Sequence, residues 1–391
     1  AWVISREEFM NKPDFLDYLK LKASAGILKS DIPIGDYYYY DERYTTSGSY
    51  SWYEGGKSRS GVIASWPSNA DLNFMTRKEM NFGLQAHLFN MLGIEANYFH
   101  DVYDGLVVRP NSTYPSFYND FVPYTNFEKD AYRGVELGLS LNKEIGDWEF
   151  YAGLNFLYSV SKRLKVNEVY ANDYQYRRGY NRSANFGLEA VGLFQSQEDI
   201  DKSPFQTFGT VKPGDIKYKD QNGDKIIDSR DEVYLCNWQA PWTEGLELKV
   251  RYKNLTLFLI GEGQQGAKAF KESSYYWMDG NDKYSVIARD CWTPETSATA
   301  SYPRLSSETN NNNFRRSSFW MYDNSFFNLR RVQLNYKIPD KLSDYLFAKD
   351  LNISLSATDL FQIAPNLKER SLRIGAEPYY RTFAVTLKAK F

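Results

Sequence analysis

The last residues of this chain form a strand pattern that ends on its own final apolar residue. Phe383, Val385, Leu387, Ala389 and Phe391 alternate with residues that are mostly polar. Successive side chains of a strand point to opposite faces, so this strand has one apolar and one polar face. A soluble sandwich can show the same alternation but rarely ends flush on an aromatic residue. The ending therefore favours a strand of a transmembrane β-barrel.

The composition agrees with a membrane barrel and argues against other classes. The chain has 391 residues with 17% aromatic residues, and its mean hydropathy is −0.57. No run approaches the roughly 18 apolar residues that a membrane helix requires. In a barrel only one strand face meets lipid, and Tyr and Trp gather at the two interfaces. A net charge of −2 gives no support for nucleic-acid binding. The start at Ala1, without a leader sequence, indicates part of a longer product.

Period-two alternation predicts about ten long strands. The residues of their apolar faces run over these ranges: 19–27, 80–88, 92–98, 135–141, 148–158, 246–252, 255–263, 332–338, 351–357 and 383–391. Tight turns are expected near Asn90, Gly146 and Lys253, and long connections near 30–74, 106–130, 164–241, 267–325 and 361–380. Short and long connections alternate, as the periplasmic turns and extracellular loops of outer-membrane barrels do. The fold class expected is all-β, a transmembrane antiparallel barrel with its carboxy-terminus in the periplasm; the alternative is a soluble all-β protein.

Several motifs resemble SusC/RagA-type TonB-dependent outer-membrane transporters of Bacteroidetes. The motifs lie in the same order and spacing over nearly the whole chain, in these segments: Asn69–Asn73, Lys78–Leu84, Gly134–Leu137, Glu189–Ser196, Pro213–Asp220 with Gln221–Asp224, Trp292–Glu295, Tyr302–Leu305, Ser318–Trp320 and Phe327–Val332. The most distinctive piece is Pro213–Asp224. The segment after Asp359–Phe361 is shorter than is usual in the family, which puts substrate contacts from that loop in doubt.

The resemblance implies a barrel of about 22 strands with a plug domain inside it. It also implies a TonB box upstream and a SusD-like surface lipoprotein as partner. Residues 1–391 would then be the carboxy-terminal half of the barrel, without the plug domain and the TonB box. Trp2–Ser5 would be the end of an earlier strand. Other implied partners are TonB, the remaining barrel strands and plug, membrane lipid and lipopolysaccharide, and nucleic acid is not among them.

A twelve-residue segment has the ligand spacing of an EF-hand-like loop. Oxygen-bearing side chains fall at positions 1, 3, 5, 9 and 12, and a backbone carbonyl at position 7, which suits Ca²⁺. The candidate ligands are Asp220, Asn222, Asp224, Ile226 (carbonyl), Asp228 and Asp231. Lys225 replaces the usual glycine and Asp231 the usual glutamate, so a solvated polar loop is the alternative. A structural Ca²⁺ is the cofactor that the sequence suggests, and no other is expected.

The remaining polar and aromatic features allow simpler explanations. Cys236 and Cys291 fall in two long loops. The sequence allows either a disulfide between them or two free thiols. Aromatic clusters at Tyr37–Tyr40, Tyr50–Tyr53 and Tyr275–Trp277 could bind sugars or the lipoprotein, or pack within their own loops. His87 and His100 lack metal-ligand or catalytic partners at useful spacing, so both are expected to be structural. No nucleophile or paired acid–base motif is present, and an enzyme is not expected.

The leading functional hypothesis is a nutrient importer in the bacterial outer membrane. It would take up oligosaccharides or peptides with a SusD-like lipoprotein and draw energy through TonB. The alternatives are a non-transporting scaffold in a larger outer-membrane complex and a diffusive porin. The membrane reading predicts that Leu351, Ile353, Leu355, Val385 and Leu387 face lipid.

Overall fold

The structure is a computed structural model. It describes residues 1–30, 39–51, 58–278, 280, 284–339, 341–342, 348, 350–371 and 380–390. Among these residues, none of the helices combines the length and the apolar character needed to cross a membrane.

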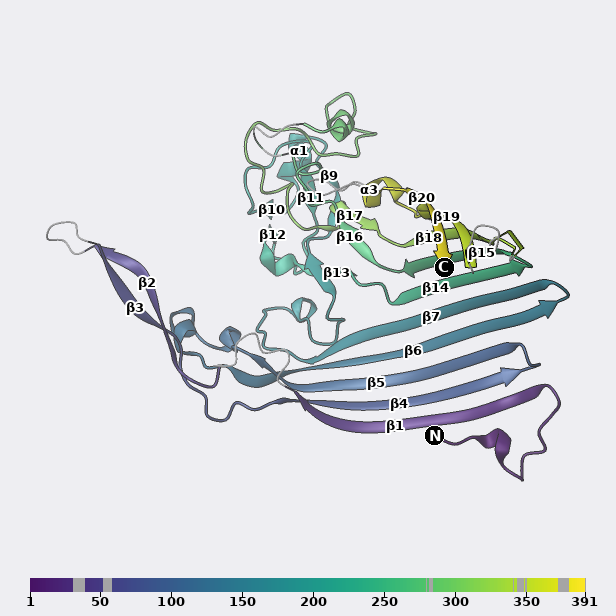
Figure 1. The fold of residues 1–391 in the computed structure, drawn as a ribbon. Coiled ribbons are helices and arrows are strands. Elements are labelled where there is room, and N and C mark those ends of the chain that lie inside the picture. Colours follow the sequence, from purple (N-terminus) through teal and green to yellow (C-terminus); the bar gives the residue numbers. More distant parts are fainter. Residues whose placement is uncertain are drawn as a thin grey trace.

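Ten long strands form a single antiparallel sheet, here called the wall (Figure 1). Their order in the sheet is their order in the chain, and every neighbouring pair is antiparallel. The strands are β1 (Leu16–Ser30), β4 (Met75–Leu88), β5 (Leu92–Val108), β6 (Thr125–Ile145), β7 (Trp148–Lys165), β14 (Trp242–Tyr252), β15 (Leu255–Gln265), β18 (Phe326–Lys337), β19 (Asp350–Ile363) and β20 (Thr382–Lys390). The ten strands predicted from alternation are all present, and the all-β fold class is confirmed.

Short and long connections separate to opposite ends of the wall (Figure 1). The turns at Asn90, Gly146 and Lys253 each contain a residue with positive φ, between 51° and 60°. A positive φ lets two antiparallel strands reverse within two or three residues. The long connections gather at the other end, as the alternation predicted. One of them carries the hairpin of β2 (Arg43–Ser51) and β3 (Ser58–Trp66), which projects away from the wall.

The apolar face of the wall is largely exposed. Ile27 is 73% exposed and Val385 74%. Two aromatic pairs mark the ends of the apolar band on β7 and β14: Tyr158 with Trp242 and Trp148 with Tyr252, each with ring centroids 4.5 Å apart. Ten residues of strand separate the two pairs, about 33 Å along the chain and roughly 25 Å in height at a barrel tilt of ~40°. That height matches the apolar band of an outer-membrane barrel.

One predicted lipid-facing residue is placed differently. Ile353, Leu355, Val385 and Leu387 are exposed, but Leu351 is only 7% exposed. The connection from β18 folds back here, because the amide of Ile338 donates a hydrogen bond to the carbonyl of Leu351. Leu351 pairs with Ala389 and lies on the same face as Ile353 and Leu387. It is buried at the end of β19, so the expectation that it is exposed to lipid is not confirmed.

The wall is open within the described residues. The first strand, β1, and the last, β20, are not neighbours in the sheet. Trp2 pairs with Leu21 on the outer edge of β1 through two backbone hydrogen bonds of 2.8 Å. Trp2 thus lies where the end of a preceding strand would lie.

Two long connections, residues 166–241 and 266–325, fold together into what we call the loop module (Figure 1). Its strands are β8 (Ala184–Gly187), β9 (Ala190–Leu193), β10 (Phe205–Gln206), β11 (Ile216–Tyr218), β12 (Ile226–Ile227), β13 (Val233–Asn237), β16 (Lys268–Phe270) and β17 (Met321–Asp323). Its described residues also include one α-helix, α1 (Gln197–Asp201), and short 3-10 helices. Its core joins both connections and contains Leu188, Ile216, Tyr218, Ile227, Tyr276, Met278, Tyr302 and Trp320. A second short helix, α3 (Leu367–Ser371), follows β19.

Candidate functional site: the inner wall face and the loop module

The polar face of the wall, here called the inner face, carries a hollow of about 540 Å³. Its lining includes Glu95, Asn97, Glu136, Asn155 and Thr243, from four adjacent strands. Strand alternation places these residues opposite the apolar side chains. A sheet with one apolar and one polar face is what a wall between lipid and an aqueous lumen requires.

Ion pairs cross between strands on this inner face. Lys22 lies 2.5 Å from Glu95, and Arg77 lies 2.9 Å from Asp101. Nearer to the loop module, Arg163 contacts Glu128 at 3.0 Å. Charge on the lipid face of a barrel is costly, whereas the inner face accepts it. The Lys22–Glu95 pair lies level with the apolar band and thus indicates the lumenal side.

Asp130 is the most buried charge of this face. It is 1% exposed and forms an ion pair with Arg182, which follows β7. A buried carboxylate that loses its partner is strongly destabilising. The pair therefore ties the start of the loop module to the wall.

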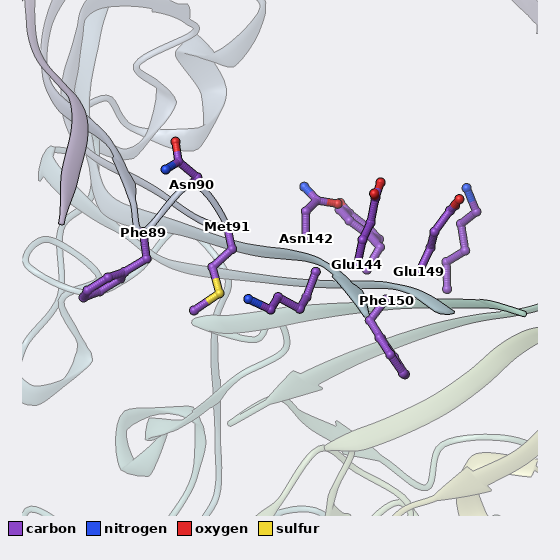
Figure 2. A pocket seen from close by; sticks show the side chains of 10 residues that line it. Phe89, Asn90, Met91, Asn142, Glu144, Glu149 and Phe150 are labelled. Atoms are coloured by element: carbon purple, nitrogen blue, oxygen red, sulfur yellow. The ribbon is translucent and has the colours of Figure 1, made fainter. Parts of the chain in front are cut away.

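A second hollow of about 410 Å³ lies at the end of the wall with the short turns (Figure 2). Phe89, Asn90 and Met91 of the β4–β5 turn line it together with Asn142 and its neighbours on β6 and β7. Among the lining side chains, Glu149 is held by Arg251 at 2.5 Å. The hollow at the short-turn end of the wall is therefore polar, like the hollow on the inner face.

Asp215 is the centre of a buried polar network in the loop module. It is fully buried, and its carboxylate lies 2.8 Å from the guanidinium of Arg304. The side-chain amides of Asn310 and Asn313 donate to the same carboxylate at 3.0 and 2.8 Å. The backbone amide of Lys212 donates to it as well, at 2.7 Å. The network joins the two connections of the module through one charge.

Side-chain amides also complete the open edge of β11. This strand pairs with β9 on one side only. On the other side Asn313 accepts from the amide of Ile216 at 2.8 Å, and Gln206 accepts from the amide of Tyr218 at 2.8 Å. Asn312 donates to the carbonyl of Ile216 at 2.9 Å. These side chains take the place of a neighbouring strand and satisfy buried backbone groups.

The most distinctive sequence motif therefore has a structural role. Gly214 and Asp215 belong to Pro213–Asp220, and Arg304 belongs to Tyr302–Leu305; the two motifs meet in this network. Gly214 has φ +90°, and a Cβ there would lie 2.5 Å from the ring of Trp292. Trp292 is itself in a third motif. Three motifs that are far apart in the sequence thus pack together in the module.

The predicted calcium loop is curled around its own backbone. The carboxylate of Asp220 accepts from the amides of Gly223 and Lys225 at 2.7 and 2.8 Å. Asp231 is fully buried and accepts from the amides of Gln221 and Asp228, both at 2.9 Å. Within the described residues no group of three or more His, Cys, Asp or Glu side chains is arranged to hold a metal ion. The calcium site stays a prediction.

Arg230 neutralises part of this loop. Its guanidinium lies 2.9 Å from Asp224 and 2.7 Å from Asp228. The side-chain amide of Asn222 also donates to Asp224, at 3.1 Å, while Ile226, in β12, donates its own backbone amide to Asp224 at 2.9 Å. Burial, and then the negative charge of Asp231, raises the pKa of the nearby Tyr174 phenol. The oxygen donors suit a divalent cation, but such an ion would have to displace Arg230.

The other sequence candidates are structural where the structure describes them. Cys236 and Cys291 are both free thiols. Tyr276 and its neighbours Tyr275 and Trp277 pack on the module core, so loop packing explains that cluster. His87 packs edge to face against Tyr18. The predicted clusters at 37–40 and 50–53 lie partly outside the described residues, although Tyr39 stacks on Tyr124 at 3.9 Å.

The chain is similar to known TonB-dependent receptors. No protein-family model matches the chain. TonB-dependent receptor P26 of Formosa agariphila is 27% identical over 92% of the chain, and TonB-dependent receptor P3 of the same organism is 21% identical over 100%. The resemblance to TonB-dependent receptors is confirmed. The chain spans 37% and 41% of the length of these two receptors.

Solved structures agree on the fold. The RagAB peptide importer in its open-open state matches with a TM-score of 0.75 and 20% identity over 98% of the chain, and its closed-closed state with 0.75 over 100%. The chain covers 41% and 42% of those chains. Its ten-stranded wall therefore has the fold of the matching part of the RagAB importer. The relatives are named as receptors, not as enzymes.

Sequence reasoning missed the polar network of the loop module. Asn310, Asn312 and Asn313 read as part of a polar loop, yet all three are buried. Their run of adjacent asparagines was the only available indication, because asparagine side chains often substitute for backbone in turns.

Proposed function

We propose that this chain is the carboxy-terminal half of the barrel of an outer-membrane importer. The long connections and the loop module face the cell exterior, and the short turns and the carboxy-terminus face the periplasm. Remaining strands of the same receptor pair with the open edges of β1 and β20. An open edge leaves backbone groups unpaired, which hydrocarbon does not tolerate. Trp2, paired with β1, supports such a preceding strand.

The observation that carries the proposal is the polar inner face of an open wall. Its hollow and ion pairs have the polarity of a lumen, and a plug domain from the rest of the receptor would fill that lumen. The plug would be released through TonB. A SusD-like surface lipoprotein would cover the exterior end, as expected for a relative of the RagAB importer.

The substrates proposed are oligosaccharides or peptides too large for porins. The RagAB relative is named as a peptide importer, which places peptides first among the substrates to test. The loop module supports a vestibule for such ligands, because it is a packed structure with its own core at the end of the lumen.

Uptake by cells that carry the full-length receptor tests the proposal. Defined mixtures of oligopeptides and oligosaccharides are supplied, and their depletion from the medium is measured by mass spectrometry. We expect depletion in the wild type and none after deletion of the receptor or of TonB. Affinity purification of the receptor should also recover a surface lipoprotein.

Two other outcomes identify the alternatives. If depletion is unchanged without the receptor while a larger outer-membrane complex falls apart, the chain belongs to a scaffold. If depletion needs the receptor but not TonB, the barrel is a diffusive porin.

The proposal includes a structural Ca²⁺ in the loop at 220–231. Asp220, Asp224 and Asp231 supply carboxylate oxygens, which Ca²⁺ prefers. The ion would take the place of Arg230 in this loop, and its contribution is to stability, not to transport chemistry.

A further inference from the structure

Cations gather on the apolar, outward face of the wall near the long connections. Backbone register places Tyr98, Val135, Tyr158 and Trp242 in one lateral row across β5, β6, β7 and β14. This row holds the aromatic residues expected at a membrane interface. Arg133, on β6, is the next outward-facing residue beyond Val135, towards the long connections.

Two lysines extend the group by one further row. Lys78 of β4, Val102, Ala131 and Lys162 of β7 are joined in register across four strands. Three strand spacings separate Lys78 from Lys162, about 14 Å. Arg133, Lys78 and Lys162 are all exposed. They form a band that we call the cationic rim.

No carboxylate among the described residues forms an ion pair with these three cations. The nearest acidic side chain on the same face is Asp104, which forms an ion pair with Lys129 at 2.8 Å and also attracts Lys78. Farther along β7, Lys165 lies 3.9 Å from the ring centroid of Phe127. His100, directly opposite Arg133, adds no negative charge. Asp104 offsets part of this charge, and the rim keeps a net positive charge on Arg133 and Lys162.

The depth of the rim in the membrane indicates what it binds. A cation that faces lipid destabilises a barrel by roughly 2–4 kcal/mol at the bilayer midplane and by little near the interface. The rim lies one and two outward positions beyond the aromatic row, about 7 and 13 Å along the strands. Anionic headgroups occupy that depth. Arg binds phosphate through paired N–H donors, and Lys binds it as a point charge.

We propose that the cationic rim of Arg133, Lys78 and Lys162 binds the phosphate groups of lipopolysaccharide in the outer leaflet. The proposal rests on the orientation given under the proposed function, with the long connections outside. The glycolipid offsets the mutual repulsion of the cations and fixes the height of the wall in the membrane on the β4–β7 side.

Lipopolysaccharide retained by the purified full-length receptor tests this inference. The receptor is extracted in mild detergent, and retained lipid A per receptor is measured by mass spectrometry. Arg133→Ala and Lys162→Ala should each reduce the affinity for lipopolysaccharide about fivefold, and the double variant about 25-fold. Lys143→Ala is the matched control, because Lys143 faces outward on the same strand near the short turns. Retention by this control should be unchanged. Migration of the unheated and heated receptor on gels shows that each variant forms its barrel.

Three results would overturn the inference. They are equal retention by the double variant and the wild type, an equal loss in Lys143→Ala, and displacement of the glycolipid by millimolar inorganic phosphate. Binding of the receptor to vesicles that contain phosphatidylglycerol is measured as well. If it depends on the rim and is as strong as binding to lipopolysaccharide, the rim is a general anion-binding surface and the inference fails. Uptake assays are independent of these readouts. Loss of glycolipid in a receptor that imports nothing would leave the inference intact while the proposed function fails.

Discussion

The wall and the loop module satisfy buried backbone groups in different ways. Wall strands bond to their neighbours along most of their length, with a few register shifts, and their side chains remain largely exposed, as Val385 shows at 74%. The module has a packed core, in which Ile216 is fully buried. There, short strands depend on the side chains of Asn313 and Gln206 for their open edges. Single substitutions should therefore damage the module locally, whereas the wall should respond mainly to changes of polarity on its outer face and to loss of the buried Asp130–Arg182 pair.

Removal of the Asp215 carboxylate should have the largest effect. Asp215→Ala leaves Arg304, Asn310 and Asn313 without their shared acceptor, and a broken buried ion pair costs roughly 3–5 kcal/mol. We expect the module to become sensitive to protease while the barrel keeps its resistance to unfolding on gels. Asp199→Ala is the control, because its ion pair with Lys217 is partly exposed and should contribute about 0–1 kcal/mol. Equal protease sensitivity of the two variants would contradict the central role of Asp215.

A pair of lysine substitutions on β7 should separate the two faces of the wall. Leu154→Lys places a charge on the outer face near the middle of the apolar band, at a cost of roughly 2–4 kcal/mol. Asn155→Lys places the same charge on the inner face, beside the hollow with Glu95 and Glu136. The free energy of unfolding of the receptor in vesicles should fall for Leu154→Lys and stay unchanged for Asn155→Lys. A similar loss for both would mean that the faces are assigned incorrectly.

Calcium should stabilise the module if the loop at 220–231 binds it. A ligand at 100 times its dissociation constant raises the free energy of unfolding by about 2.7 kcal/mol. The increase should disappear in Asp220→Asn with Asp224→Asn, and Arg230→Ala should bind more tightly because a competing cation is removed. Calorimetric titration with CaCl₂ gives the affinity. Identical heats for the wild type and the double variant would exclude the site.

The same contrast explains what the sequence could predict. Wall strands require one alternating pattern over ten or more residues, so their existence, turns and faces followed from residues such as Leu246, Leu248 and Val250. Leu351 follows the pattern but is buried at the end of its strand, and alternation does not encode that burial. In the module, contacts such as Asp215 with Arg304 join residues 89 positions apart. No local pattern relates such residues, and only the order of the motifs indicated that they belong together.

Alkaline pH should weaken the module slightly and leave the wall unchanged. Burial, and then the charge of Glu369, raises the pKa of Tyr276 from its ordinary value of 10.0 to about 12. A phenol whose pKa is raised in the folded state contributes its full stability below pH 10 and loses it as the pH rises through 12. At pH 11 we expect a loss of about 1 kcal/mol in the free energy of unfolding of the module. Tyr276→Phe should remove this part of the pH dependence. At neutral pH it should cost little, because the Tyr276 hydroxyl has no hydrogen-bond partner among the described residues. Protease sensitivity of the module measured from pH 8 to pH 12 provides the comparison, and parallel curves for the wild type and Tyr276→Phe would contradict it.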